Sequence, residues 1–413
     1  MYKISKSTHL LSLVLIAIGL ISTVYAFIND SHAAWTSLIF NNYFFLGISI
    51  FAVFFVALQH VAEAGWSTVI KRVPEAIMTF LPYACAVMIF IVIAGIFHMN
   101  HIYHWLEGFQ ITSIQKFPFF EFMMVDLLDP NDSHFDKIIA GKVAYLNPIF
   151  FLVRSIIYVV VWIYCAKRLR DISLQGDLEG GIGEKSYNNG ITVSAWFIVF
   201  FAVSSSMASW DWIMSIDTHW FSTLFGWYIF SEWSAIGFTT ILLFCLLLKK
   251  QGYLEDLNDS IIHDLGKWVF AFSVVWTYMW FSQFMLIWYA NIPEEVTYFM
   301  ERIELSNYRF LFWFSAAINF VVPTIVLMSR DAKRNTNFLI VASVVILIGH
   351  WINSYLLFAP GTLHDHGHLG LTELGMGLGF LGLFLFVVFR SLTTRPLSVK
   401  HHPFLEESKH LHT

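Results

Sequence analysis

The sequence predicts an all-α integral membrane protein with ten transmembrane helices, and two observations carry this prediction. First, 57% of the 413 residues are apolar and only 13% are charged, a composition typical of membrane proteins. Second, apolar runs long enough to cross a hydrocarbon core of about 30 Å recur along the whole chain. The net charge of -5 is modest and the basic residues are spread through the loops, so we expect no nucleic-acid partner.

The first apolar run raises the question of a cleaved signal peptide. Lys3 and Lys6 precede it, but the run is long enough to span the bilayer and has no Ala-x-Ala site at its end, so we expect a retained helix. The ten predicted spans are, in chain order, residues 10–28, 40–66, 74–97, 145–166, 190–214, 224–248, 265–290, 308–329, 337–357 and 370–390.

The distribution of basic residues predicts the orientation. With a cytoplasmic N-terminus, 18 of the 24 Lys and Arg residues fall in inner loops and flanks, and Arg154 lies inside a span. Basic residues favour the cytoplasmic side of a membrane, so the sequence predicts N-in and C-in topology. The basic residues left on the outer side are Lys116, Lys137, Lys142, Arg302 and Arg309.

A weak internal repeat favours two four-helix bundles. The second and sixth spans run in the same direction and open with similar steps, Phe45-Leu46-Gly47 and Leu224-Phe225-Gly226. Spans two to five and six to nine would then form bundles related by a parallel repeat. The predicted parts are a peripheral first span (1–39), a first bundle (40–214) with a long outer loop (98–144), a second bundle (215–357), and the last span with a cytoplasmic tail (358–413). A loop of that length is expected to pack over the outer surface or against a partner.

Ionisable residues gather between Ser204 and Trp233, where one span ends and the next begins. Asp211, Asp217, His219 and Glu232 lie there among several tryptophans. Tryptophan is common at a membrane interface, but Glu232 lies about eight residues inside its span, where a carboxylate is costly in lipid. A protein-lined or hydrated site is therefore expected.

Other polar residues fall at similar depth in the outer halves of their spans. They are Arg154, Gln283, His350, Asn353 and Glu373. The functional interpretation is a polar cavity that opens outward and holds a ligand head group, such as a quinone, or conducts protons. The structural alternative is an ion pair between Arg154 and Glu232 that joins the bundles, with the amide side chains as contacts between helices.

A second polar set lies near the inner end of the second span. His60 and Glu63 are three residues apart, a spacing that predicts one helical face. Together with Glu232 and Glu373 they could form inner and outer halves of a proton path. The alternative is that Glu63 only reaches toward the basic residues Lys71 and Arg72.

The sequence offers no strong cofactor site. Cys85, Cys165 and Cys245 lie in apolar segments without C-x-x-C spacing, so we expect buried packing residues rather than a zinc site or an iron–sulfur cluster. His60 and His350 lie at different depths, which argues against a haem with two axial histidines. The groups at 98–104 and 364–368 are interpreted as interfacial histidines rather than as metal sites.

Two stretches resemble a known family. At Asp211–Phe230 (DWIMSIDTHWFSTLFGWYIF) and Leu286–Arg302 (LIWYANIPEEVTYFMER), the chain resembles the membrane subunits of bacterial alternative complex III, a quinol:cytochrome c oxidoreductase. These subunits belong to the larger NrfD-like family, typified by the membrane anchor of polysulfide reductase. The ten-span layout extends the likeness over nearly the whole chain, which looks most like the shorter of the two such subunits, the second quinone-binding subunit.

The resemblance implies two four-helix bundles in a bacterial inner membrane and no covalent cofactor, haem or iron–sulfur cluster in this chain. It also implies partners: a larger NrfD-like paralogue, c-type cytochrome subunits, an iron–sulfur subunit, lipids and a quinone such as menaquinol. In such complexes the larger paralogue is the better candidate for quinol oxidation, and the shorter subunit conducts protons or stabilises the assembly.

Three functions are therefore considered. The first is a subunit of a quinol:cytochrome c oxidoreductase that supports quinol oxidation and proton conduction. The second is a stand-alone proton-coupled secondary transporter, which calls for helices broken by Gly or Pro at matching places; Pro82 and Pro323 are the mid-span candidates. The third is a purely structural scaffold.

Overall fold

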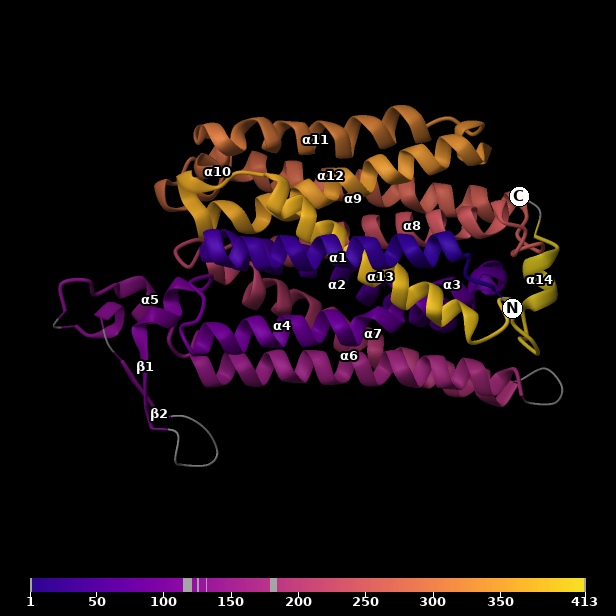
Figure 1. Ribbon diagram of the computed structural model, residues 1–413, viewed down its shortest axis with the longest axis horizontal. Helices are drawn as coiled ribbons and strands as arrows, with labels where there is room; N and C mark the ends of the chain where they lie inside the picture. The colour runs from indigo at the N-terminus through magenta and orange to yellow at the C-terminus, as the bar shows by residue number, and fades with distance from the viewer. Residues whose placement is uncertain (1, 114–120, 125, 131, 179–183, 412–413) are drawn as a thin grey trace.

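The computed structural model describes residues 2–113, 121–124, 126–130, 132–178 and 184–411. Within these residues, ten helices are long and apolar enough to cross a membrane, which confirms the predicted fold class and the number of spans (Figure 1). The spans are α1 Lys6–Asn29, α2 Ser31–Val61, α3–η2–α4 Arg72–Ile96, α6 Pro148–Gly176, α7–η5 Glu184–Ile216, α8 Phe225–Lys250, α9 Asp259–Ala290, α11 Ser306–Leu327, α12–η7 Thr336–His366 and α13 Leu371–Thr393.

Short elements complete the chain. The third span is divided into α3 (Arg72–Ile77), the 3-10 turn η2 (Met78–Phe80) and α4 (Leu81–Ile96), and α7 (Glu184–Trp212) and α12 (Thr336–Leu363) are followed by 3-10 turns. The remaining elements are η1 Gly65–Ile70, η3 His104–Gly108, β1 Phe109–Ser113, β2 Glu121–Met124, η4 Asp126–Leu128, α5 Lys137–Lys142, η5 Met214–Ile216, α10 Pro293–Glu304, η6 Ala332–Arg334, η7 His364–His366 and α14 Leu405–Lys409.

Polar caps set where several helices begin. Asp30 accepts hydrogen bonds from the backbone N–H groups of His32 and Ala33, so α2 begins at Ser31, nine residues before the predicted start at residue 40. Such a side chain satisfies N–H groups that have no partner within the helix. Asn147, Asn258 and Asn335 cap α6, α9 and α12 in the same way.

The helices form two four-membered groups. The first group contains α2, α4, α6 and α7, and each helix packs on the next in this order, with α7 returning to α2. The second group contains α8, α9, α11 and α12, and it closes in the same way, with α12 packing on α8. The groups meet where α2 and α7 contact α8 and where α2 contacts α12. The buried apolar side chains of both groups belong to one continuous core, so the bundles share a single interior.

Glycines let the central helices α2 and α8 approach closely. A Cβ atom on Gly47 of α2 would lie 2.4 Å from Trp233 Cδ1, and one on Gly237 of α8 would lie 2.0 Å from Phe51 Cδ1. Each glycine therefore receives an aromatic ring from the facing helix. This reciprocal packing fixes the joint between the bundles. One of the two rings belongs to Trp233, which follows Glu232 in the sequence.

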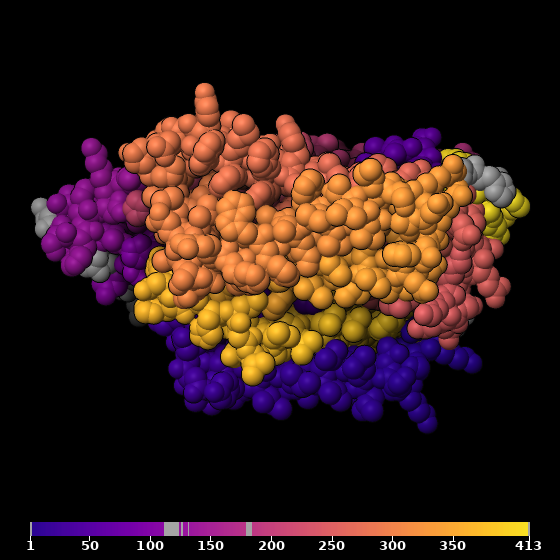
Figure 2. Space-filling view, turned by 90° about the horizontal axis from the view of Figure 1, so that it is seen from above, coloured from indigo at the N-terminus to yellow at the C-terminus, as the bar shows by residue number. Residues whose placement is uncertain are grey.

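The pair α1 and α13 lies outside the bundles, with α13 against α2. Their backbones touch where a Cβ on Gly19 would lie 2.2 Å from Gly379 Cα. Figure 2 shows α1 (indigo) along one edge, beside the yellow C-terminal segment. Large apolar side chains of α1, such as Leu20 and Ile21, are exposed, as expected for a helix that faces lipid.

The two ends of the molecule differ. The loop end carries residues 98–144, in which Trp105 is buried against Phe151, while the hairpin of β1 and β2 extends to one side (Figure 1). Residues 114–120, 125 and 131 of this loop lie outside the described residues. The terminal end carries both chain termini (Figure 1), as an even number of spans requires. The tail from residue 397 to 411 crosses this end, where Ser408 bonds Trp66 and Val69 of the segment after α2.

Candidate functional site

Glu232 lies at the joint of the two bundles and is the centre of a buried polar network. Its side chain is fully buried in α8. Oε2 accepts a hydrogen bond from the Tyr43 hydroxyl of α2 at 3.0 Å. Oε1 accepts from Asn353 Nδ2 at 2.9 Å and from Ser354 Oγ at 3.4 Å, both in α12. Three helices therefore hold one carboxyl group at membrane depth.

A histidine completes this network. His350 Nδ1 lies 3.9 Å from Glu232 Oε1, and the imidazole ring stands edge-on to Trp276 with a centroid distance of 4.9 Å. Neither ring nitrogen has a hydrogen-bond partner in the described part of the chain. An imidazole and a carboxyl group at this separation can exchange a proton after a small rotation or through one water molecule.

A cavity of about 320 Å³, which includes the space at its mouth, adjoins the network. Tyr228 and Asn353 line it and are bonded to each other at 3.0 Å, so the bond from Asn353 to Glu232 joins the cavity to the carboxyl group. Gln283 also lines the cavity, and its Oε1 atom is buried without a hydrogen-bond partner in the described part of the chain. The other lining residues are Trp280, Tyr298, Phe299, Arg302, Phe312, Leu356 and Leu357.

Arg302 is a site residue that the sequence analysis did not single out. Its guanidinium lies 3.4 Å over the Tyr298 ring, donates to Leu356 O at 3.1 Å and approaches Asp217 Oδ2 at 3.5 Å. Burial raises the pKa of Asp217, and Arg302 partly offsets this rise. In the sequence, Arg302 is marked only by its position at the end of the stretch Leu286–Arg302, which resembles the known family. Its helix, α10, was predicted as part of an outer loop and not as a span.

Arg154 pairs with Asp211, which contradicts the structural alternative of an ion pair between Arg154 and Glu232. Nε and Nη2 of Arg154 donate to the two Asp211 oxygens at 2.9 and 2.8 Å. The Tyr158 hydroxyl adds a third hydrogen bond at 3.0 Å. Helices α6 and α7 are direct neighbours in the first bundle, whereas Glu232 faces α2 and α12. A carboxylate so fully bonded has a structural role.

Glu373 is also separate from the Glu232 network. Its Oε2 accepts from the backbone N–H of Gly370 at 2.8 Å, and its Oε1 accepts from Ser37 Oγ at 3.3 Å. These bonds tie the first turn of α13 to α2 and satisfy a free N–H group of the helix. The structure thus places this predicted proton-path residue in a helix-capping position.

His219 lies at the loop end, where Nε2 meets Asp136 Oδ2 at 2.6 Å. Half of its side chain is exposed, so it is outside the buried network. The same aspartate caps α5, because Oδ1 accepts from the backbone N–H groups of Ile138 at 2.8 Å and Ile139 at 3.1 Å. His219 therefore contributes to attaching α5 at this surface.

Replacing Asp136 by Ala should accelerate amide hydrogen exchange at Ile138 and Ile139, because the cap is worth about 0.5–2 kcal/mol. Partial burial raises the pKa of Asp136, but hydrogen bonds from Ile139 and His219 outweigh it, so the pKa lies below the ordinary 3.8. This stabilisation is therefore present above pH 3.8 and is lost as the pH falls through the lower folded value. Asp132→Ala, in an exposed turn, is the control; equal exchange in both variants would contradict the assignment.

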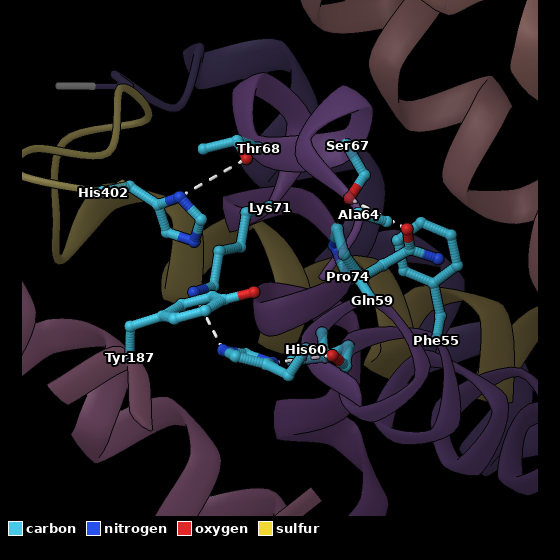
Figure 3. Close-up of a pocket in the computed structure, with 11 residues that line it drawn as sticks. Phe55, Gln59, His60, Ala64, Ser67, Thr68, Lys71, Pro74, Tyr187 and His402 are labelled. Carbon is cyan, nitrogen blue, oxygen red and sulfur yellow. Dashed lines mark hydrogen bonds between the residues drawn. The ribbon is translucent and has the colours of Figure 1, made fainter. Parts of the chain in front are cut away.

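The predicted pairing of His60 and Glu63 on one helical face is wrong. Helix α2 ends at Val61, and Glu63 follows it with a φ of 49° and an exposed side chain. His60 is buried and contacts Lys71 instead, at 3.2 Å (Figure 3). No ion pair joins Glu63 to Lys71 or Arg72 among the residues described. The chain leaves α2 after Val61 and turns into η1, which begins at Gly65. Residues three apart across this turn therefore do not share a helical face.

The cysteines are free and buried, as predicted from their apolar surroundings. In the described ranges, no group of three or more His, Cys, Asp or Glu side chains is placed to hold a metal ion.

No protein-family model matches the chain, and no curated protein matches it.

Proposed function

We propose that this chain is an integral membrane subunit of a bacterial quinol:cytochrome c oxidoreductase, and that protons move through the Glu232 network in its core. The observation that carries the proposal is the buried Glu232 carboxyl group, bonded by three side chains and adjoining a cavity. Ionisable groups at membrane depth commonly mark ion or proton pathways. The resemblance to alternative complex III supports the choice of complex.

The chemistry of the network suits proton transfer better than simple attachment. Tyr43, Ser354 and Tyr228 carry hydroxyl groups, each of which can both donate and accept a hydrogen bond. His350 has two ring nitrogens without partners. In contrast, Asp211 is held by a guanidinium that stays protonated in proteins, so a proton cannot pass along that pair. The Glu232 network is therefore the favoured route.

The cavity beside the network is also the place where we propose that a quinol head group approaches. The rings of Trp280, Phe299 and Phe312 form apolar walls, and Gln283 Oε1 is a free acceptor for a quinol hydroxyl. Binding pockets for small molecules combine apolar walls with a few fixed polar groups in this way. Protons released on quinol oxidation would reach Glu232 from the cavity through a water molecule, because the Asn353 amide orients the carboxyl group but does not relay protons.

Glu232→Gln should lower proton translocation by the assembled complex roughly tenfold or more. Glutamine has the shape of glutamate and can accept from Asn353 while it donates to the Tyr43 oxygen, but it cannot release a proton. The measurement is the proton-to-electron ratio of quinol:cytochrome c activity in proteoliposomes. Glu373→Gln is a matched control, because it changes a buried carboxyl group that caps α13 and bonds Ser37 of α2.

The two alternatives give different results in the same experiment. If Glu232→Gln changes the yield of assembled complex but leaves the proton-to-electron ratio intact, the scaffold function replaces the proposal. If the purified chain alone catalyses substrate uptake driven by a proton gradient, it is a transporter. The helix geometry disfavours a transporter, because Pro82 lies in the first turn of α4 and Pro323 lies inside α11, which are not matching positions in the two bundles.

A further inference from the structure

A second polar pocket lies at the terminal end, distant in the fold from the Glu232 network. Two adjoining hollows share His60, Lys71, Tyr187 and His402. These residues come from the end of α2, the segment after η1, the start of α7 and the C-terminal tail (Figure 3). No carboxylate is among the residues that line either hollow.

Lys71 brings a positive charge into this pocket without an acidic partner. Its Nζ lies 3.2 Å from His60 Nε2, while His60 Nδ1 lies 2.8 Å from the carbonyl oxygen of Val56. A carbonyl can only accept, so Nδ1 carries the proton and Nε2 accepts from Lys71. This bond uses one of the three ammonium hydrogens. Burial lowers the pKa of Lys71 to about 8, so the ammonium is still the main form at neutral pH.

The acidic residues that interact electrostatically with Lys71 are engaged elsewhere. Glu75 and Asp177 both form ion pairs with Arg72. In the described part of the chain, no carboxylate lies within ion-pair distance of Lys71. A sheltered ammonium is costly unless a negative charge compensates it, so the pocket is short of an anion.

Two further donors point into the same space. The backbone N–H of Phe404 donates to His402 Nδ1 at 3.3 Å, so the hydrogen of the neutral ring lies on Nε2, which faces Lys71 in Figure 3. The Tyr187 hydroxyl is buried and has no hydrogen-bond partner among the residues that the structure describes. Lys71, His402 and Tyr187 therefore present N–H and O–H groups from three separate elements, and the pocket supplies no acidic acceptor for them.

We propose that this pocket binds a phosphate group, carried by an anionic phospholipid or present as free phosphate. A phosphate offers several strong acceptor oxygens and negative charge, which match a lysine and two neutral donors. The hydroxyls of Ser67 and Thr68 line the same pocket, but they donate to Gln59 Oε1 at 3.2 Å and His402 Nδ1 at 3.5 Å, so the other three donors remain for the phosphate. The position at the end of the spans is at the depth of lipid head groups. The proposal does not depend on the Glu232 network.

The first test uses inorganic phosphate and the full-length chain in detergent after removal of lipid. Phosphate should raise the unfolding temperature in a concentration-dependent way relative to chloride at equal ionic strength, because a ligand that binds the folded state stabilises it. Lys71→Met should weaken the apparent affinity about tenfold, equal to about 1.4 kcal/mol. Lys71→Arg should retain most of the effect. Lys250→Met is the control, since Lys250 is exposed at the same end of the molecule and outside the pocket.

The second test distinguishes the two sources of phosphate. The chain is transferred to nanodiscs of phosphatidylcholine with or without phosphatidylglycerol, and retained lipid is measured by native mass spectrometry. Retention of phosphatidylglycerol by the wild type and its loss in Lys71→Met support a lipid head group; a response to inorganic phosphate alone supports the free ion. If Lys71→Met does not fold, His402→Phe replaces it in both tests. Equal responses of wild type and variant to both ligands would overturn the proposal.

Discussion

Arg154→Leu is expected to lower the free energy of unfolding by about 3–5 kcal/mol, because it leaves a buried carboxylate without its cation. Asp211 is completely buried, and two of its three side-chain hydrogen bonds come from Arg154. The guanidinium also packs over the rings of Tyr145 and Phe150, at 3.9 and 4.1 Å from their centroids. The substitution therefore removes both a charge pair and the packing of α6 against the loop end.

Equilibrium unfolding in mixed micelles measures this effect. Arg168→Leu, on the same helix but exposed, should cost less than about 0.5 kcal/mol. The double variant Arg154→Leu with Asp211→Leu should recover much of the lost stability, since no uncompensated charge remains. A single variant as stable as the wild type would show that Asp211 finds another partner and that the pair does not hold α6 to α7.

Gly237→Ala is expected to destabilise the protein by about 1–3 kcal/mol through overpacking. The added methyl group would lie 2.0 Å from Phe51 Cδ1 and 2.8 Å from Phe51 Cβ. Phe51 is buried in the core, so its ring cannot turn away without displacing further side chains. The helices α2 and α8 would have to separate at the joint that also holds Tyr43 against Glu232.

Gly141→Ala is the matched control, because beyond its chain neighbours and the backbone of its own helix no atom of the described residues lies within 4 Å of the position where its Cβ would be. An alanine there, inside α5, should stabilise the helix by about 0.5–1 kcal/mol. The two substitutions add the same methyl group and are predicted to have opposite signs. A thermal unfolding scan of both variants decides the matter, and equal shifts would show that the close approach of α2 and α8 does not limit stability.

The buried carboxylates of Asp211 and Glu232 have different environments. Asp211 is saturated by a cation and a tyrosine within one bundle. Glu232 lies between the bundles, is bonded only by neutral donors, and has His350 and a cavity beside it. A carboxylate that is paired with a guanidinium stays deprotonated. A carboxyl group that is bonded only by neutral donors can gain or lose a proton with fewer changes in the surrounding hydrogen bonds. This contrast supports the proposal that Asp211 attaches α7 to α6 and that Glu232 transfers protons.

Individual residues show where sequence reasoning succeeded. Glu232 stood out because a carboxylate at that depth in an apolar run is costly, and the structure places it in a buried polar network. Predictions of side-chain contacts from the spacing of residues along the sequence were less successful. Glu63 was expected beside His60 because three residues make nearly one helical turn, but α2 had already ended. Arg302 was overlooked because it lies in α10, a short helix outside the spans, and folds back onto the second bundle.

The sequence by itself determined the membrane-spanning fold and the ten helices, because the thickness of a bilayer translates directly into runs of apolar residues. Only the tertiary structure decided which polar residues meet. Arg154 pairs with Asp211 rather than with Glu232. Glu232 is bonded by Tyr43 and Asn353, which lie on other helices. The C-terminal tail places His402 in the same pocket as Lys71. The helices are apolar on nearly every side, so periodicity does not mark which face meets which neighbour, and these choices depend on how the helices pack.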